Sequence, residues 1–135
     1  MMSNKKIQLV KVGNRTLHAL GNVDLLNGPC VSVAGSREIE SNSSEWLQDI
    51  ISRCGRNAIV SGLARGTDTV AHQASIKYHK PTIAVLPSGL KNIYPKQNRG
   101  LARQIVNNGG LLLSEYPNNS FINRTEACNR QSQAF

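Results

Sequence analysis

The stretch "NAIVSGLARGTDTVAHQ", residues 57–73, joins a short apolar run to a glycine-containing loop and then to a segment with helical spacing. Such a pattern predicts a buried strand, a loop and a helix, in that order. This is the repeating unit of a parallel sheet, in which neighbouring strands need a crossover connection. The glycines, arginine, aspartate and small hydroxyl side chains of the loop also suit an anionic group.

The same unit recurs along the chain. Four apolar runs predict strands: residues 29–36, 57–62, 82–89 and 111–117. Helical spacing predicts three helices between them: residues 39–55, 68–78 and 98–108. We therefore expect an α/β fold, namely a Rossmann-like open, mainly parallel sheet with helices on both faces. Residues 1–28, which break at Gly13-Asn14, predict a small strand or hairpin appendage of the same domain, and residues 29–135 its core.

All three expected helices have an apolar face, and that of the second is expected to be Val70, Ala71, Ala74 and Tyr78. The first carries these residues on one face: Trp46, Leu47, Ile50, Ile51 and Cys54. Its start can be capped by Ser41, Ser43 or Ser44, and Gly55 can end it. The buried stripe of the third is expected to be Leu101, Ala102, Ile105 and Val106.

The chain is strongly basic, with 16 Lys and Arg residues against 8 Asp and Glu residues, a formal charge of +8. Such a charge attracts polyanions, so nucleic acid is a candidate partner, although excess cations also keep a small protein soluble. With one tryptophan, three tyrosines and two phenylalanines, the chain lacks a surface of base-stacking rings, so binding would depend on phosphates.

The cysteines Cys30, Cys54 and Cys128 lie far apart and form no CxxC pair, so we expect reduced thiols and neither a disulfide framework nor a metal site. The apolar runs are too short for a membrane span, and the first residues do not resemble a signal peptide. We expect a cytoplasmic protein without membrane contact.

The predicted strands end in "AGSR", "SGLARG", "LPSGL" and "LSEYP", which would meet at one edge of the sheet, where such folds bind ligands. Gly35, Ser36 and Arg37 offer flexible backbone, a hydroxyl and a guanidinium for a phosphate, although on their own they are better explained by a tight turn with a solvated arginine. The loop from Ser61 to Asp68 adds backbone N–H groups and the positive end of a helix. Neither GxGxxG nor GxxxxGK[ST] is present.

The polar residues near these loops have structural explanations beside functional ones. Asp68 is the expected cap of the second helix, and its alternative role is to hold Arg37 or a ligand hydroxyl. His72 could pair with Asp68 in acid–base chemistry, but a lone helical histidine more often packs. Glu115 is either a buried hydrogen-bond partner or a catalytic carboxylate, and the first is favoured because no nucleophile is evident.

The stretch "PSGLKNIYPKQNRG", residues 87–100, places Lys91, Lys96 and Arg99 around Tyr94. Such a loop could take phosphates on its cations and a base on the ring. Tyr94-Pro95 could equally be a turn that packs on the sheet.

Four stretches together carry a family resemblance: "ALGNVDLLNGPCVSVAGSRE", "IVSGLARGTDTVAHQ", "TIAVLPSGLKNIYPKQN" and "LLLSEYP". In this order and spacing the chain resembles the DNA-processing protein A family, also called DprA or Smf, over residues 19–117. The resemblance implies a protein without catalytic activity or cofactor that binds single-stranded DNA independently of sequence. It also implies help in loading a RecA-type recombinase during natural transformation, and a homodimer.

The resemblance carries site residues over by position. The residues that would line the DNA pocket are Gly35, Ser36, Arg37, Ser61, Gly62, Arg65, Gly66, Thr67, Asp68, Ser88, Gly89, Lys91, Tyr94, Asn98 and Arg130. Among them Arg37 is the leading phosphate contact.

The final stretch, "FINRTEACNRQSQAF", keeps Asn129-Arg130 but replaces the apolar continuation typical of the family by polar residues. We therefore expect a shorter sheet with an exposed edge, in either a pared-down relative or a fragment. A second hypothesis is a sensor of the SLOG superfamily that binds a nucleotide-derived ligand at the same strand ends. A third, a phosphoribohydrolase, is disfavoured because "LPSGLKNIYP" lacks the glycine pair and glutamate of that signature.

Overall fold

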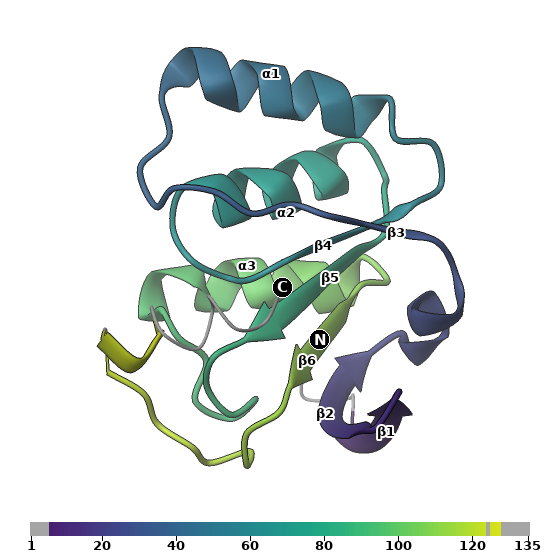
Figure 1. The fold of residues 1–135 in the computed structure, drawn as a ribbon, viewed down its shortest axis with the longest axis vertical. Coiled ribbons are helices and arrows are strands. Elements are labelled where there is room, and N and C mark those ends of the chain that lie inside the picture. Colours follow the sequence, from purple (N-terminus) through teal and green to yellow (C-terminus); the bar gives the residue numbers. More distant parts are fainter. Residues whose placement is uncertain (1–5, 124, 128–135) are drawn as a thin grey trace.

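The computed structural model describes residues 6–123 and 125–127, and its centre is a six-stranded sheet with the order β1-β2-β6-β5-β4-β3 (Figure 1). The strands are β1 (Gln8–Val12), β2 (Arg15–Gly21), β3 (Cys30–Ser32), β4 (Ala58–Ser61), β5 (Thr82–Leu86) and β6 (Leu111–Ser114). Strands β3 to β6 run parallel, whereas β1 pairs antiparallel with β2 and β2 antiparallel with β6. The expected mainly parallel sheet and the expected hairpin, turning at Gly13-Asn14, are confirmed. The division of the chain at residue 28 stays a prediction.

Three α-helices connect the parallel strands: α1 (Ser41–Ser52), α2 (Thr67–Lys77) and α3 (Arg99–Asn107). Two 3-10 helices accompany them: η2 (Val23–Asn27) and η3 (Lys96–Asn98). Figure 1 shows α1, α2 and α3 stacked in one row, with α2 between the other two.

The helices cover the two faces of the sheet unequally. Alternate strand residues divide between them: Ile59, Ala84 and Leu112 pack with the α-helices, whereas Ala58, Ile83 and Leu113 pack with η2 residues such as Leu25. Each crossover leads to the next strand in the same direction, and right-handed crossovers then place all three α-helices on one face. The expectation that helices cover both faces is therefore only partly met. All three α-helices lie on one face, and the short η2 lies on the other.

The apolar stripe of α3 is confirmed, because Leu101, Ala102, Ile105 and Val106 are all buried. The apolar stripe of α1 is only partly buried: Leu47 and Ile51 are buried, but Trp46 is 67% exposed. The cause is position, since α1 ends the row of helices beside the edge strand β3. The expected serine cap of α1 is wrong, because the N-cap is Glu40 and its side chain makes no capping hydrogen bond.

No helix in the described part of the chain is both long and apolar enough to cross a membrane.

Candidate nucleic-acid interface

The loops after β3 and β4 are locked together at the carboxyl edge of the sheet. The Ser36 carbonyl accepts a hydrogen bond from the Thr67 N–H (3.0 Å) and another from the Thr67 hydroxyl (2.9 Å). Gly66, with φ of +78°, lies so close that a Cβ there would be 2.4 Å from the carbonyl carbon of Arg37. Only glycine fits this approach. Arg65 and Arg37 therefore lie on backbone segments that touch.

The buried side chain of Asp68 holds the loop after β4 through hydrogen bonds. Its carboxylate accepts hydrogen bonds from the Ser61 hydroxyl (2.8 Å) and the Ala64 N–H (3.2 Å). Burial raises the pKa of the Asp68 carboxyl, while the Ser61 hydroxyl, the Ala64 N–H and the Arg37 guanidinium act in the opposite direction. The expected capping role of Asp68 is wrong, because Gly66 is the N-cap of α2 and Asp68 lies inside the first turn. Its attraction to Arg37 agrees with the alternative interpretation.

Asn98 ties the loop after β5 to the loop after β4. Its buried side-chain amide donates to the Leu63 carbonyl (2.8 Å) and to the Thr69 hydroxyl (2.9 Å). The amide thus joins η3 to the loop after β4 and to the first turn of α2, which are 35 and 29 residues away from Asn98 in the sequence. Buried amides with satisfied donors fix backbone geometry.

His72 lies in the core beneath the loops and is fully buried. Its Nε2 lies 2.6 Å from the Gly62 carbonyl and its Nδ1 lies 2.7 Å from the Thr82 hydroxyl. Burial lowers the pKa of His72 to about 4, so the ring is neutral near neutral pH. The packing interpretation of His72 is confirmed, since both ring nitrogens are engaged inside the fold.

The Ser88-Gly89 loop is held by the end of β6 and by the segment that follows it. The Ser114 hydroxyl donates to the Ser88 carbonyl (2.7 Å), and the Gly89 N–H donates to the Ser120 carbonyl (3.1 Å). A Cβ on Gly89 would be 2.0 Å from the Pro117 carbonyl oxygen, so a side chain has no room there. The loop is thereby fixed up to Lys91.

Sequence reasoning misses two supports of these loops, the hydroxyls of Thr82 and Ser114. The Thr82 hydroxyl lies 2.7 Å from His72 Nδ1 and 2.9 Å from the Ile59 carbonyl oxygen, while the Ser114 hydroxyl donates to the Ser88 carbonyl. Both occupy buried positions at the ends of otherwise apolar strands. A polar residue at such a position is the signal that points to them.

The expected site residues form two groups by solvent exposure: accessible residues, which form the surface of the site, and buried residues, which support it. Exposed or half-buried are Gly35, Ser36, Arg37, Arg65, Gly66, Lys91 and Tyr94. Buried are Ser61, Gly62, Thr67, Asp68, Ser88, Gly89 and Asn98. Arg130 lies outside the described residues. We call Arg37, Arg65 and Lys91 the cationic rim, because these three are the cations on the accessible part of the set.

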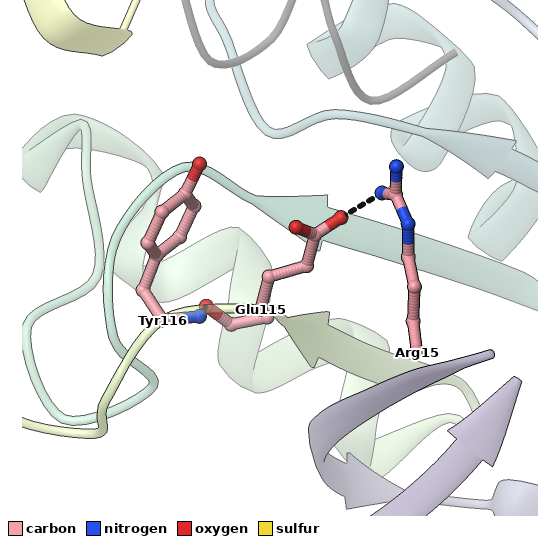
Figure 2. Close-up of polar contacts among 4 residues, drawn as sticks. Arg15, Glu115 and Tyr116 are labelled. Atoms are coloured by element: carbon pink, nitrogen blue, oxygen red, sulfur yellow. Dashed lines mark hydrogen bonds and ion pairs between the residues drawn. The ribbon is translucent and has the colours of Figure 1, made fainter.

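Glu115, directly after β6, forms an ion pair with Arg15 of β2 (Figure 2). Figure 2 shows the two side chains reaching toward each other, with Tyr116 on the far side of Glu115 from Arg15. The expected buried role of Glu115 is wrong, since its side chain is 41% exposed. The β1–β2 hairpin brings Arg15 next to β6, so Glu115 pairs with an exposed arginine and not with buried backbone.

A hollow of about 710 Å³ lies beside the interface, between β3 and α1. Its lining includes Glu38, Glu40 and Trp46, and no lysine or arginine among the described residues. It also shares Gly35, Ser36 and Thr67 with the expected site. The two acidic residues disfavour a phosphate at their end of the hollow. Within the residues that the structure covers, no group of histidine, cysteine, aspartate and glutamate side chains could hold a metal ion.

Comparison with known proteins bears on the family and the fold of the chain. The model of the family "DNA recombination-mediator protein A" matches residues 5–132. The DNA processing protein DprA of Streptococcus pneumoniae is 42% identical over 97 residues, which are 71% of this chain and 34% of that protein. Protein Smf of Synechocystis is 41% identical over 107 residues, 75% of this chain and 27% of that protein. The chain thus spans about a third or less of the length of these relatives.

Two solved structures are similar in fold. The X-ray structure of DprA from Streptococcus pneumoniae superposes with a TM-score of 0.76 and 37% identity, over 85% of this chain and 41% of that one. DprA from Helicobacter pylori, described for its single-stranded DNA binding mode, gives a TM-score of 0.77 and 26% identity, over 96% of this chain and 65% of that one. The family model covers most of the chain, and the two structures share its fold: the chain belongs to the DNA recombination-mediator protein A family.

Proposed function

We propose that this chain binds single-stranded DNA independently of sequence, through phosphate contacts at the carboxyl ends of the parallel strands. The observation that carries the proposal is the close approach of the Gly66 and Arg37 backbones, which puts half-buried Arg37 and exposed Arg65 on adjoining loops. The formal charge of +8 adds a field that attracts a polyanion.

The division into rim and support explains how the site would work. Arg37, Arg65 and Lys91 would meet phosphates, because guanidinium and ammonium groups form strong charge-assisted hydrogen bonds with phosphate oxygens. Buried side chains such as Asp68 and Asn98 hold the loops in place before DNA arrives. Preorganised loops lose less conformational freedom on binding, which favours affinity.

Binding of this kind would select little among base sequences. Half-buried Tyr94 is the one aromatic ring among the expected site residues. Phosphate contacts carry no sequence information, whereas base readout needs side chains that reach base edges. The chain is thus proposed to act without catalysis or cofactor, in the cytoplasm, in DNA processing and recombination with a RecA-type recombinase.

A nucleotide-derived small ligand is the competing candidate, as in a sensor. A ligand of this kind would need an enclosed phosphate pocket, but the hollow beside the site carries Glu38 and Glu40. Carboxylates in that position disfavour an anionic ligand.

Fluorescence anisotropy across a salt series separates the two functions. A labelled single-stranded oligonucleotide is titrated, with duplex DNA and a mononucleotide as competitors. Three phosphate contacts predict that log K falls against log salt with a slope of about −2, and that the mononucleotide competes poorly. Binding that ignores salt and is displaced by the mononucleotide would contradict the proposal.

A further inference from the structure

Arg15, the first residue of β2, lies at the same edge of the sheet as the loops of the candidate site. β2 runs antiparallel to β6, so β2 begins where β6 ends. The ladder between the two strands pairs His18 with Ser114, the last residue of β6, and Arg15 comes three residues before His18. The β1–β2 hairpin therefore brings a further cation to the carboxyl edge, one that is absent from the set of residues expected from the sequence.

The segment after β6 connects this arginine to the cationic rim. Its Asn118 carbonyl accepts a hydrogen bond from the Lys91 N–H (2.8 Å), and its Glu115 side chain pairs with Arg15. Lys91 and Arg15 thus both adjoin residues 115–118. In the sheet order, β2 lies three strands from β4, which is about 14 Å at the usual strand spacing. A DNA strand with about 3.4 Å per phosphate covers this distance with about five phosphates, and a more extended strand with fewer.

The ion pair holds Arg15 only weakly. Figure 2 shows the side chains of Arg15 and Glu115 meeting end to end, and both are largely exposed to solvent. Exposed ion pairs of this kind contribute little free energy. Nη1 of Arg15 contacts Oε1 of Glu115, and a guanidinium carries further N–H donors beside that one. Because a phosphate and a carboxylate repel each other, a phosphate that approaches Arg15 competes with Glu115.

The hairpin is held to the sheet by other contacts. β2 pairs with β6 at four positions, and the β2 residues Leu17, Ala19 and Leu20 are buried in the core. Burial of apolar side chains and a backbone ladder outweigh one exposed ion pair. Arg15 can therefore change its partner without loosening the fold.

We propose that Arg15 is a further phosphate contact of this site and that it exchanges Glu115 for a DNA phosphate on binding. The inference rests on the proposed function, and it extends the DNA path from the cationic rim along the carboxyl edge to the β1–β2 hairpin. In the free protein the Glu115 carboxylate pairs with the guanidinium. In the complex a phosphate takes its place, since two phosphate oxygens match the fork of a guanidinium. Glu115 thereby acts as a built-in competitor that lowers the affinity of the site.

Fluorescence anisotropy of Arg15→Ala and Arg53→Ala across a salt series tests the contact, with a labelled single strand of about 12 nucleotides. Arg53 is the matched control: it also forms an exposed pair with a carboxylate, Asp49 (3.3 Å), but at the end of α1, where the chain turns back to the start of β4. Arg15→Ala should lower the affinity about threefold and flatten the slope of log K against log salt by about 0.7. Arg15→Lys should keep most of the slope. Equal effects of Arg15→Ala and Arg53→Ala would overturn the proposal.

Neutralising the carboxylate tests the exchange. Glu115→Gln should raise the affinity by about two- to fivefold, because the guanidinium then has no ion pair to give up. Asp49→Asn makes the same change in the control pair and should leave the affinity within about twofold. In the Arg15→Ala background the gain from Glu115→Gln should disappear. A gain that persists there would mean that Glu115 merely repels DNA, which would overturn the exchange.

Arg37→Ala, measured in the same series, separates this inference from the proposed function. If Arg37→Ala weakens binding while Arg15→Ala matches Arg53→Ala, the site stands and Arg15 is no part of it. If Arg37→Ala and Arg15→Ala both bind like the wild type, the DNA lies elsewhere and both proposals are wrong. Thermal unfolding of each variant shows whether a loss of affinity is a loss of folding.

Discussion

The carbonyl of Ser36 accepts both hydrogen bonds that Thr67 donates, one from its N–H and one from its hydroxyl. This single carbonyl therefore fixes the loop after β3 to the first turn of α2. Replacing Thr67 by valine keeps the shape of the side chain but removes one donor, so we expect a loss of about 1 kcal/mol in the free energy of unfolding. DNA affinity should fall with it, because Arg37 follows Ser36. Urea denaturation and anisotropy measure the two effects, and Thr67→Ser, which keeps the hydroxyl, should lie close to the wild type.

Gly66 and Gly100 should respond to alanine with opposite signs. At Gly66 the new methyl group would lie 2.4 Å from Arg37 backbone atoms, and φ is +78°, so Gly66→Ala should destabilise the fold by more than about 2 kcal/mol. At Gly100, in α3, nothing lies within 4 Å of the new methyl group. Gly100→Ala should therefore stabilise by about 0.5–1 kcal/mol. Thermal unfolding of the two variants compares them directly, and equal effects would refute the close approach at Gly66.

Buried His72 should make the fold less stable in mild acid. Its folded pKa of about 4 lies below the unfolded value of 6.5, so between these values the unfolded chain binds the extra proton. The free energy of unfolding then falls as the pH drops through this window, by up to about 3 kcal/mol, and the contribution is constant above pH 6.5. Asp68 acts with the opposite sign, because burial raises its folded pKa above 3.8 and its contribution is lost as the pH rises through that folded value.

Urea denaturation between pH 4.5 and pH 8 checks the role of His72. His72→Gln will be less stable at every pH, because it cannot reproduce both contacts of the ring, so the informative quantity is the slope against pH. That slope should become flatter in the variant below pH 6.5. An unchanged slope would mean that another group causes the acid sensitivity.

The Arg15–Glu115 ion pair should contribute little to stability despite joining the hairpin to β6. Both side chains are largely solvent-exposed, at 64% and 41%, so water and salt screen the attraction. A double-mutant cycle with Arg15→Ala and Glu115→Ala should give a coupling free energy below about 1 kcal/mol that shrinks with added salt. A coupling of several kcal/mol would show that the hairpin depends on this pair.

The strand order could be only partly predicted from the sequence. Apolar runs and helical spacing located the four parallel strands and the three α-helices, because local periodicity reports burial. The direction of each crossover is a tertiary property, so the sequence did not reveal that α1, α2 and α3 share one face. The exposure of Trp46 escaped prediction for a related reason: an apolar stripe does not show how much of it a neighbour covers.

The candidate site was predicted as a set of loops, but the roles within it were not. Glycines and small polar residues after strands indicated the loops correctly. Which polar residues are buried depends on contacts between loops that are far apart in the sequence, such as that between Asn98 and Leu63. Asp68 was therefore interpreted as a cap, although its carboxylate is turned to Ser61 and Ala64.

The most direct test of the cationic rim is the salt dependence of single-strand binding for Arg37→Ala and Arg65→Ala, each compared with Lys77→Ala. Lys77 is an exposed cation in the last turn of α2, at the opposite end of that helix from Gly66, so its loss makes the same charge change away from the rim. Each rim variant should lose about tenfold in affinity and flatten the slope of log K against log salt by about 0.7, the release expected for one phosphate contact. Lys77→Ala should keep the wild-type slope. If all three variants bind alike, the rim is not where the phosphates lie.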